Sequence, residues 1–346
     1  MVLLSQIFEF IANNWIIVAF LAPMSWALVN VIDVYFVDGI YDDELDGTII
    51  SGIFQIMPWF VILPIVNTHM SDYIKLGFSQ AGSSLLNFSI NFNPALLLSF
   101  AGGLLFSLSF YFYFKALFHR NDVALVEILT NLCVVAVPLM SFFLFHERLS
   151  FLSYFGMGIT LSGALVLSFS SAIRNNGSKI LYVTMLLSVI FLSVSMIFES
   201  KAYSMLESSG ISESTGFWAG FLFFSLGVFT CSFVFAIINK RNPFPLIKKY
   251  SRIFLIAESI SFSGTLFSQR ALDISPSSSY VATIETFVPV FVLLYSLIVV
   301  GYASIFFRHP NKKFILTKIY REQFIGVPFK FAAIVVMGLG VYVLSS

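Results

Sequence analysis

The chain has 346 residues, of which 58% are hydrophobic and 11% are charged, whereas soluble domains carry about 25% charged residues. Together with a mean hydropathy of +0.91, this composition excludes a single soluble core and predicts an all-α integral membrane protein with the lipid bilayer as a partner. The net charge of +1 gives no general attraction for nucleic acid, so no nucleic-acid partner is expected.

Ten apolar segments follow one another along the chain. A membrane-spanning segment needs about 20 mostly apolar residues, and its backbone groups must pair internally, which makes it a helix. The segments are residues 14–37, 49–66, 95–118, 122–145, 151–171, 179–204, 216–238, 253–272, 277–301 and 328–344. The predicted fold class is therefore all-α, with ten transmembrane helices in one membrane body.

The polar connections differ in charge. Residues 38–47 are acidic, residues 67–94 form a longer loop, and residues 239–252 are basic. Residues 302–327 are basic with interleaved Phe and Ile, which fits either an interfacial segment or a solvated loop. Most of the 19 Lys and Arg residues lie at the odd-numbered connections. By the positive-inside rule, both termini would then lie outside the cytoplasm.

The sequence contains a weak internal repeat. Residues 110–145 align without gaps to residues 265–300, an offset of 155 positions. Lys115 then meets Arg270, and the identical residues are Phe112 with Phe267, Ala116 with Ala271, Leu117 with Leu272, Val126 with Val281, Val135 with Val290, Val137 with Val292, Leu139 with Leu294 and Ser141 with Ser296. We predict two five-helix repeats, residues 1–173 and 174–346. Because five is odd, the second copy is inverted, as in many secondary transporters.

Residues 111–171 carry a recognisable order of short motifs. Lys115–Ala116–Leu117 ends one helix, His146–Glu147–Arg148–Leu149 fills a turn, and Gly156, Gly158 and Gly163 mark the helix after it. This stretch resembles the EamA-type domain of the drug/metabolite transporter superfamily. The second half repeats the pattern with Gln269–Arg270–Ala271–Leu272 and with Glu285–Thr286–Phe287–Val288–Pro289–Val290.

The chain also departs from the family pattern. His146 stands where a turn glycine is usual, Val134 stands where Pro289 stands in the second half, and the second half lacks the Glu-Arg turn. The resemblance implies export or exchange of amino acids, metabolites, nucleotide sugars or drugs. It also implies cytoplasmic termini, which opposes the charge distribution, so the orientation stays open.

Ionisable residues inside spans are the main candidates for a site, because each costs about 2.5–3.5 kcal/mol at mid-helix. Glu285 lies near the middle of the ninth segment, and Pro289 frees the backbone carbonyl of Glu285. Glu127 lies in the fourth segment, with Asn131 one turn later. We predict that these residues bind a proton or a solute amine. The alternatives are an interhelical hydrogen bond for Glu285 and a helix N-terminal carboxylate for Glu127.

Aromatic and helix-end residues complete the predicted site. Trp26, Trp59, Tyr111 and Tyr280 are candidates for lining a solute cavity, with helix packing as the alternative. Asp33 and Glu199 lie near the ends of the first and sixth segments, and Lys115 and Arg270 at the ends of the third and eighth. We expect these four charges to lie at the membrane interface, with gating of the site as the alternative; Lys115 and Arg270 could also pair with acidic residues.

The residues together predict a secondary transporter that moves small metabolites such as amino acids or amines by alternating access, with proton coupling as an option. A translocase for a lipid-linked or amphipathic substrate is the alternative. The four histidines lie in separate loops, and no nucleotide-binding or zinc motif is present. We therefore expect no enzyme activity, no metal site and no cofactor. The chain is expected to act as a monomer, or else a dimer, in a bacterial plasma (inner) membrane.

Overall fold

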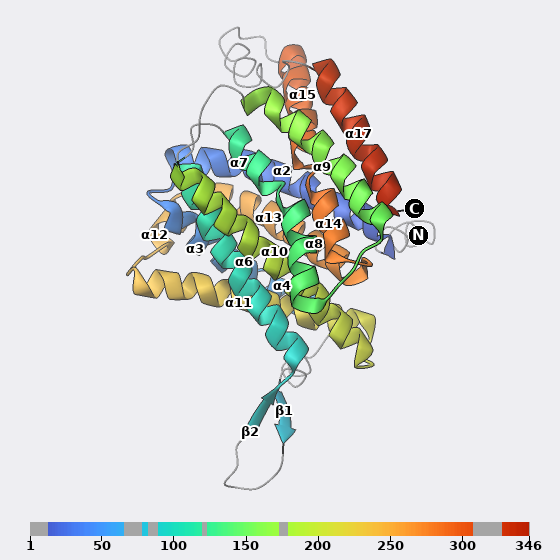
Figure 1. Ribbon diagram of the computed structural model, residues 1–346. Coiled ribbons are helices and arrows are strands. Elements are labelled where there is room, and N and C mark those ends of the chain that lie inside the picture. The colour runs from blue at the N-terminus through green and yellow to red at the C-terminus, as the bar shows by residue number, and fades with distance from the viewer. Residues whose placement is uncertain are drawn as a thin grey trace, which may run out of the picture.

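The computed structural model describes residues 13–65, 78–81, 89–119, 123–172, 179–306 and 327–345, and these are almost entirely helical (Figure 1). The helices are α2 (Trp15–Gly39), α3 (Glu44–Ile56), α4 (Trp59–Ile65), α6 (Pro94–Phe118), α7 (Val123–Thr130), α8 (Cys133–Phe145), α9 (Phe151–Ala172), α10 (Lys179–Ser208), α11 (Glu213–Ile238), α12 (Phe244–Lys249), α13 (Ser251–Ile274), α14 (Ser278–Glu285), α15 (Val288–Phe306) and α17 (Val327–Ser345).

Eight segments of the described chain are long and apolar enough to cross a membrane. They are Trp15–Gly39, Glu44–Pro64, Pro94–Phe118, Ile128–Phe145, Lys179–Ser208, Glu213–Ile238, Ser278–Ile298 and Pro328–Ser345. The chain is therefore a multi-pass helical membrane protein. The predicted segments 151–171 and 253–272 also form helices, α9 and α13, but they are not among these eight. In α13, charged residues such as Glu258 and Arg270 lower the apolar character.

Two connections differ from the sequence prediction. Residues 67–94, predicted as a loop, contain the strands β1 (Phe78–Ala81) and β2 (Ser89–Phe92), which pair as an antiparallel hairpin. The second span begins at Glu44 and not at residue 49. Asp43 caps its first turn by accepting a hydrogen bond from the Leu45 N–H, and acidic residues favour a helix N-terminus.

Three of the predicted continuous helices are broken. The second span is interrupted at Met57–Pro58, the fourth at Asn131–Leu132, and the ninth at Thr286–Phe287. Each break separates two helices that follow each other closely in the chain, namely α3 and α4, α7 and α8, and α14 and α15. Such discontinuities leave backbone groups without helical partners, which is tolerated in membranes where the backbone is buried in protein or lines a cavity.

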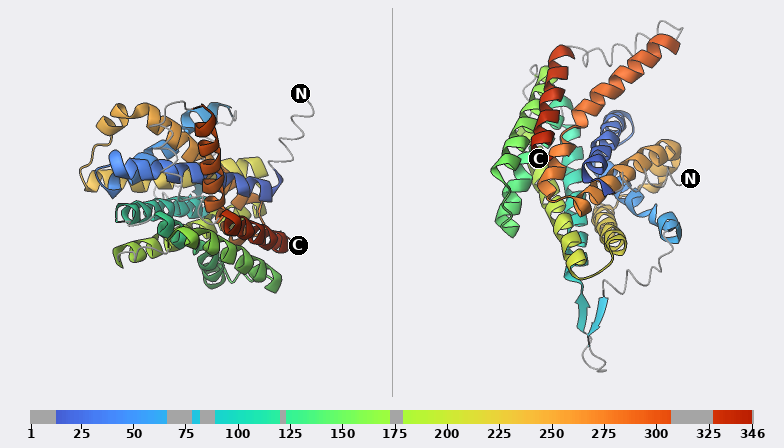
Figure 2. Two further views of the ribbon diagram at one scale, coloured as in Figure 1. Left: turned by 90° about the horizontal axis from the view of Figure 1, so that it is seen from above. Right: turned by 90° about the vertical axis from the view of Figure 1, so that its right-hand side faces the viewer.

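The long helices pack in a few close pairs. Helix α6 packs against α10 and α11, α2 packs against α13, and α9 packs against α17 (Figure 2). At the α9–α17 contact, a Cβ added to Gly156 would lie 2.8 Å from the Gly340 carbonyl oxygen, and one added to Gly340 would lie 2.7 Å from the Gly156 carbonyl oxygen. The two glycines therefore permit a close backbone approach.

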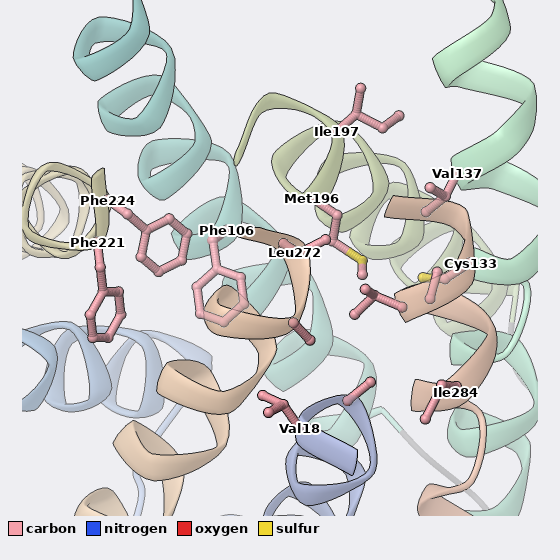
Figure 3. Close-up of a cluster of buried hydrophobic side chains, with 14 of the residues drawn as sticks. Val18, Phe106, Cys133, Val137, Met196, Ile197, Phe221, Phe224, Leu272 and Ile284 are labelled. Atoms are coloured by element: carbon pink, nitrogen blue, oxygen red, sulfur yellow. The ribbon is translucent and has the colours of Figure 1, made fainter. Parts of the chain in front are cut away.

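The interior is aromatic where these pairs meet. Phe106 of α6 and Phe224 of α11 lie 5.2 Å apart between ring centroids, and Met196 and Leu272 converge on the same region from α10 and α13 (Figure 3). A second cluster lies at the other end of α13, where Phe254 packs with Phe36 and Phe114. The two clusters leave a polar region between α2, α6, α10 and α13, and the candidate site lies there.

Candidate functional site

A cavity of about 140 Å³ lies where the central helices meet. Its walls come from α2, α6, α10 and α13, together with residues next to the breaks in the fourth and ninth spans. The lining residues are Trp26, Val29, Asn30, Asp33, Phe106, Ser109, Phe110, Tyr113, Thr130, Ser188, Leu192, Ser195, Met196, Ser268, Gln269, Leu272, Glu285 and Val288. Three of the predicted site residues, Trp26, Asp33 and Glu285, therefore face one cavity.

Glu285 is the last residue of α14, immediately before the break. Its carboxylate accepts a hydrogen bond of 2.6 Å from the Ser268 hydroxyl of α13. Pro289 lies one turn later in α15, and a proline has no N–H to give to the Glu285 carbonyl. A side-chain carboxylate and a freed backbone carbonyl thus belong to the same residue at the cavity wall.

The fourth span contributes its own break to the same region. Asn131 is buried and lines a smaller cavity of about 40 Å³, which shares Asn30, Tyr113 and Glu285 with the larger one. Thr130 lines both cavities. Residues at both breaks therefore line two neighbouring cavities that share part of their walls.

Helix α2 supplies the second carboxylate. Asp33 is only 6% exposed, yet it lines the larger cavity. No hydrogen bond or ion pair joins its carboxylate to another residue in the described part of the chain. Its neighbour one turn earlier, Asn30, accepts a hydrogen bond of 3.3 Å from the Tyr113 hydroxyl of α6. Asp33 is thus a buried carboxylate that keeps its hydrogen-bonding capacity for whatever enters the cavity.

One wall of the cavity is aromatic. The ring of Trp26 lies 6.4 Å from Phe106 and 6.2 Å from Phe110, and the two phenylalanine rings are 4.8 Å apart. None of the described residues that line either cavity is Lys, Arg or His. The cavity therefore combines two carboxylates with an aromatic surface and has no fixed positive charge among those residues.

Other predicted residues lie outside the cavity. Trp59 is 3% exposed and packs edge-on against Trp218 in the core. Tyr111 packs against Phe235. Tyr280 lies beside Trp15 and hydrogen-bonds to the Ser153 hydroxyl at 2.9 Å. None of these three aromatic residues lines the cavity, and each packs against another aromatic ring.

One further predicted carboxylate differs from the expected arrangement, and another lies outside the described side chains. Glu199 is fully buried against Gly102 of α6 and does not line the cavity. Glu127 lies in α7, but its side chain is outside the described residues. The predicted pairing of Glu127 with Glu285 therefore stays a prediction.

The two helix-end cations each bind an acidic residue of a neighbouring helix. Lys115, in the last turn of α6, lies 3.8 Å from Glu44, the first residue of α3. Arg270, near the end of α13, lies 2.6 Å from Glu213, the first residue of α11, and also pairs with Asp273. We call the part of the molecule around the Lys115–Glu44 pair the Lys115 end, and the part around the Arg270–Glu213 pair the Arg270 end.

These two ends lie on opposite sides of the cavity. Helix α13 begins among residues that pack with the end of α6, and it finishes beside Glu213 (Figure 1). The rise from Phe254 to Arg270 is about 24 Å. A polar vestibule of about 510 Å³ opens at the Arg270 end and is lined by Glu207, Glu213 and Asp273.

Several lining residues were not predicted from the sequence. Ser268 and Gln269 of α13 and Ser188 and Ser195 of α10 face the cavity. The available signal was helical spacing of small polar residues in apolar helices, as at Ser261, Thr265 and Ser268. In the described residues, no group of three or more His, Cys, Asp or Glu side chains is placed to hold a metal ion.

Comparison with known proteins identifies the fold only. No protein-family profile and no curated protein matches the sequence. A protein of known crystal structure is similar to this chain with a TM-score of 0.58 and 17% sequence identity, covering 96% of this chain and 95% of that chain. Its description, "Crystal structure of protein", names no activity. At this identity the likeness shows a shared fold along nearly the whole chain.

Proposed function

We propose that the chain is a secondary transporter of small metabolites that works by alternating access, with ten spanning helices in two inverted repeats, residues 1–173 and 174–346. The observation that carries the proposal is the pair of helix breaks at Asn131–Leu132 and Thr286–Phe287, both of which adjoin the central cavity. Broken helices at corresponding positions of two repeats are a mark of transporter binding sites.

The two breaks correspond residue by residue. At the offset of 155 positions, Asn131 matches Thr286 and Leu132 matches Phe287. Three backbone hydrogen bonds at one break have counterparts at the other. They are Leu132 to Leu129 (3.1 Å), Val135 to Leu132 (3.0 Å) and Ala136 to Leu132 (2.9 Å) in the first half, and Phe287 to Ile284 (3.0 Å), Val290 to Phe287 (2.9 Å) and Phe291 to Phe287 (3.2 Å) in the second. This agreement supports a repeat that the sequence identities alone leave weak.

Helix packing supports the same symmetry. Exchanging the two halves replaces the α2–α13 pair by the α10–α6 pair, and both pairs are in extensive contact. The α9–α17 and α3–α11 pairs each map onto themselves, and both are also present. The ten-helix order and this packing are the features on which the EamA-type assignment rests.

The ion pairs provide the gates in this proposal. Lys115 and Arg270 match at the same offset. Their partners do not, because Glu44 aligns with Glu199 and not with Glu213. Glu44 and Glu213 nevertheless each begin the span that precedes the cation's span. One pair holds α3 to α6 at one end, and the other holds α11 to α13 at the opposite end. Opening one pair while the other stays closed would expose the cavity to one side at a time.

The proposed setting follows from this role. A transporter of this kind needs no cofactor or catalytic centre, and one chain holds the complete site, so we propose a monomer acting in a bacterial plasma membrane. Glu285 is the proposed proton carrier, because it is the carboxylate at a helix break. The Ser268 hydroxyl donates a hydrogen bond to one oxygen of the Glu285 carboxylate, and the other oxygen can take the proton.

Exchange in proteoliposomes tests the proposal. Purified protein would be supplied with labelled amino acids, amines, organic acids and nucleotide sugars, with and without a pH gradient. We expect exchange of one class, with loss of gradient-driven uptake in Glu285→Gln. The control is Glu207→Gln, which removes an exposed carboxylate from the vestibule. Folded protein that exchanges none of the panel would contradict solute transport and favour a lipid-linked substrate.

A further inference from the structure

Resting on the proposed transport function, we infer that the central cavity selects organic cations: small amines whose apolar body is about the size of one aromatic ring. The inference uses the charge, the shape and the lining of the cavity. It narrows the substrate from small metabolites in general to one chemical class, and it excludes organic acids and sugar phosphates.

Charge is the first argument. Asp33 and Glu285 both line the cavity, and the described lining residues include no Lys, Arg or His that would neutralise them. A negatively charged solute would face two carboxylates in a site of low dielectric constant, where like charges repel strongly. An ammonium group would instead supply the missing counter-charge.

Asp33 is the residue placed to receive that ammonium group. It is 94% buried, since its exposed fraction is 6%, and no described residue donates a hydrogen bond to its carboxylate. Buried carboxylates are normally paired, because an unpaired one carries a large desolvation cost. A bound ammonium would provide both the charge and the N–H donors. Glu285 differs because Ser268 already occupies one oxygen.

The aromatic wall is the second argument. Trp26, Phe106 and Phe110 come from two helices and lie within 6.4 Å of one another by ring centroid. Aromatic faces attract cations, with about 0.5–2 kcal/mol per favourable contact. The same faces receive an apolar body. A solute that is cationic at one end and apolar at the other matches both features of the lining.

Volume sets the size of the solute. The cavity holds about 140 Å³ and shares part of its wall with a second cavity of about 40 Å³. An apolar cavity of about 150 Å³ accepts a benzene molecule. Benzylamine is therefore a suitable probe, with its ring in the larger space and its ammonium toward Asp33. Benzyl alcohol and benzoate keep the ring and change only the charge.

Binding of these three probes to purified protein in detergent, measured by isothermal calorimetry, tests the inference without relying on transport. We expect benzylamine to bind at least about tenfold more tightly than benzyl alcohol, which is 1.4 kcal/mol, and benzoate not to bind. Equal binding of benzylamine and benzyl alcohol, tighter binding of benzoate, or no binding of any probe would each overturn the inference.

Variants locate the effect. Asp33→Asn should weaken benzylamine binding by roughly 30-fold or more, as expected for losing one partner of a buried charge pair, and should leave benzyl alcohol unchanged. Asp42→Asn is the matched control, because Asp42 is exposed and lies outside the cavity. Trp26→Leu should cost roughly 3- to 30-fold and Trp26→Phe much less. The wild-type series remains decisive if Asp33→Asn fails to fold.

The outcomes separate this inference from the proposed function. Exchange of organic acids in proteoliposomes, with no amine binding, would refute the cation specificity and leave the transporter intact. Tight amine binding with no exchange of any solute would support the site and refute transport.

Discussion

The breaks in the fourth and ninth spans have similar backbone geometry and differ in their side chains. In the first half the break at Asn131–Leu132 follows Thr130, and in the second the break at Thr286–Phe287 follows Glu285. Three hydrogen bonds correspond across the two breaks, and the first half has a fourth, from the Val134 N–H to the Asn131 carbonyl at 3.2 Å, which Pro289 at the matching position cannot donate. Yet only the second half has a carboxylate at the last residue before the break, and only the second half has a proline three residues after it.

This difference distinguishes the backbone break, which both halves have, from the carboxylate, which only the second half has. If both halves adopt the same discontinuity, the discontinuity belongs to the fold, and the carboxylate is an addition to one copy. In the inverted repeat that we propose, the frame that changes shape is symmetric and the binding site is asymmetric. The following predictions test that separation.

Moving the carboxylate from one half to the other should have the largest effect. Glu285→Thr gives the second break the side chain that the first has, and we expect transport to fall by roughly 30-fold or more. The double variant Glu285→Thr with Thr130→Glu returns a carboxylate to the same cavity from the opposite half, since Thr130 also lines it. Exchange in proteoliposomes should recover in part. Full activity of the single variant would show that Glu285 is not part of the site.

The two ends of the molecule should respond in opposite directions. Lys115→Gln removes the Lys115–Glu44 pair, and Arg270→Gln removes the Arg270–Glu213 pair. Partly exposed pairs contribute about 0.2–1 kcal/mol, which corresponds to roughly a 1.4- to 5-fold shift between the two facing states. We expect each variant to favour opening at its own end.

Labelling of a cavity cysteine measures this shift. Val288→Cys places a thiol at the cavity wall, in a background with Cys133→Ala and Cys231→Ser. A membrane-impermeant thiol reagent added from each side reports access. Faster labelling from the same side in both cation variants would contradict two opposed gates. Lys201→Gln provides a control, because Lys201 is an exposed helix cation outside both pairs.

Replacing Pro289 should have a smaller effect. The first half is broken although Val134 stands at the position of Pro289, so the proline is not required for a break of this geometry. We expect Pro289→Ala to reduce exchange by less than about fivefold, well below the roughly 30-fold cost of losing the carboxylate. Val134→Pro is the reciprocal variant and should be tolerated likewise. A loss in Pro289→Ala as large as that in Glu285→Thr would mean that the proline creates the second break.

Sequence reasoning located the apolar helices and placed Glu285 within the ninth of them, but it predicted continuous helices and none of the breaks. Pro289 indicates a freed carbonyl at Glu285, and α14 ends there. The break at Asn131–Leu132 has no proline at the matching position, so it depends on packing between helices. Packing between helices also decides why Trp59 and Tyr111, which the sequence named as candidates for the cavity lining, do not line the cavity. Their depth in a span can be read from the sequence, but the rotation of their helices about the long axis cannot.

Polar residues at the cavity wall were missed for a related reason. Ser268 is one of several small hydroxyl residues in α13, and hydroxyl groups in apolar helices often bond to their own backbone, as Thr265 does to the Ser261 carbonyl at 3.1 Å. Only the placement of α13 against α14 distinguishes Ser268, whose hydroxyl reaches Glu285. The repeat alignment could not supply this contact either, because Ser268 is matched by Tyr113 in the first half.

A substitution at the C-terminal end of the fourth span, His146→Gly, should have the smallest effect, and this effect is on stability. Helix α8 stops at His146, which has a left-handed backbone with φ of 57°, whereas α15 continues past the matching Gly301 to Phe306. A non-glycine residue in this conformation costs about 1–2 kcal/mol, partly offset by the greater freedom of glycine in the unfolded chain. His146→Gly should therefore raise the thermal midpoint of unfolding slightly. His119→Gly is the control, because His119 caps α6 with φ of −102° and gains no such relief. A lower midpoint for His146→Gly than for His119→Gly would mean that the His146 side chain stabilises the turn.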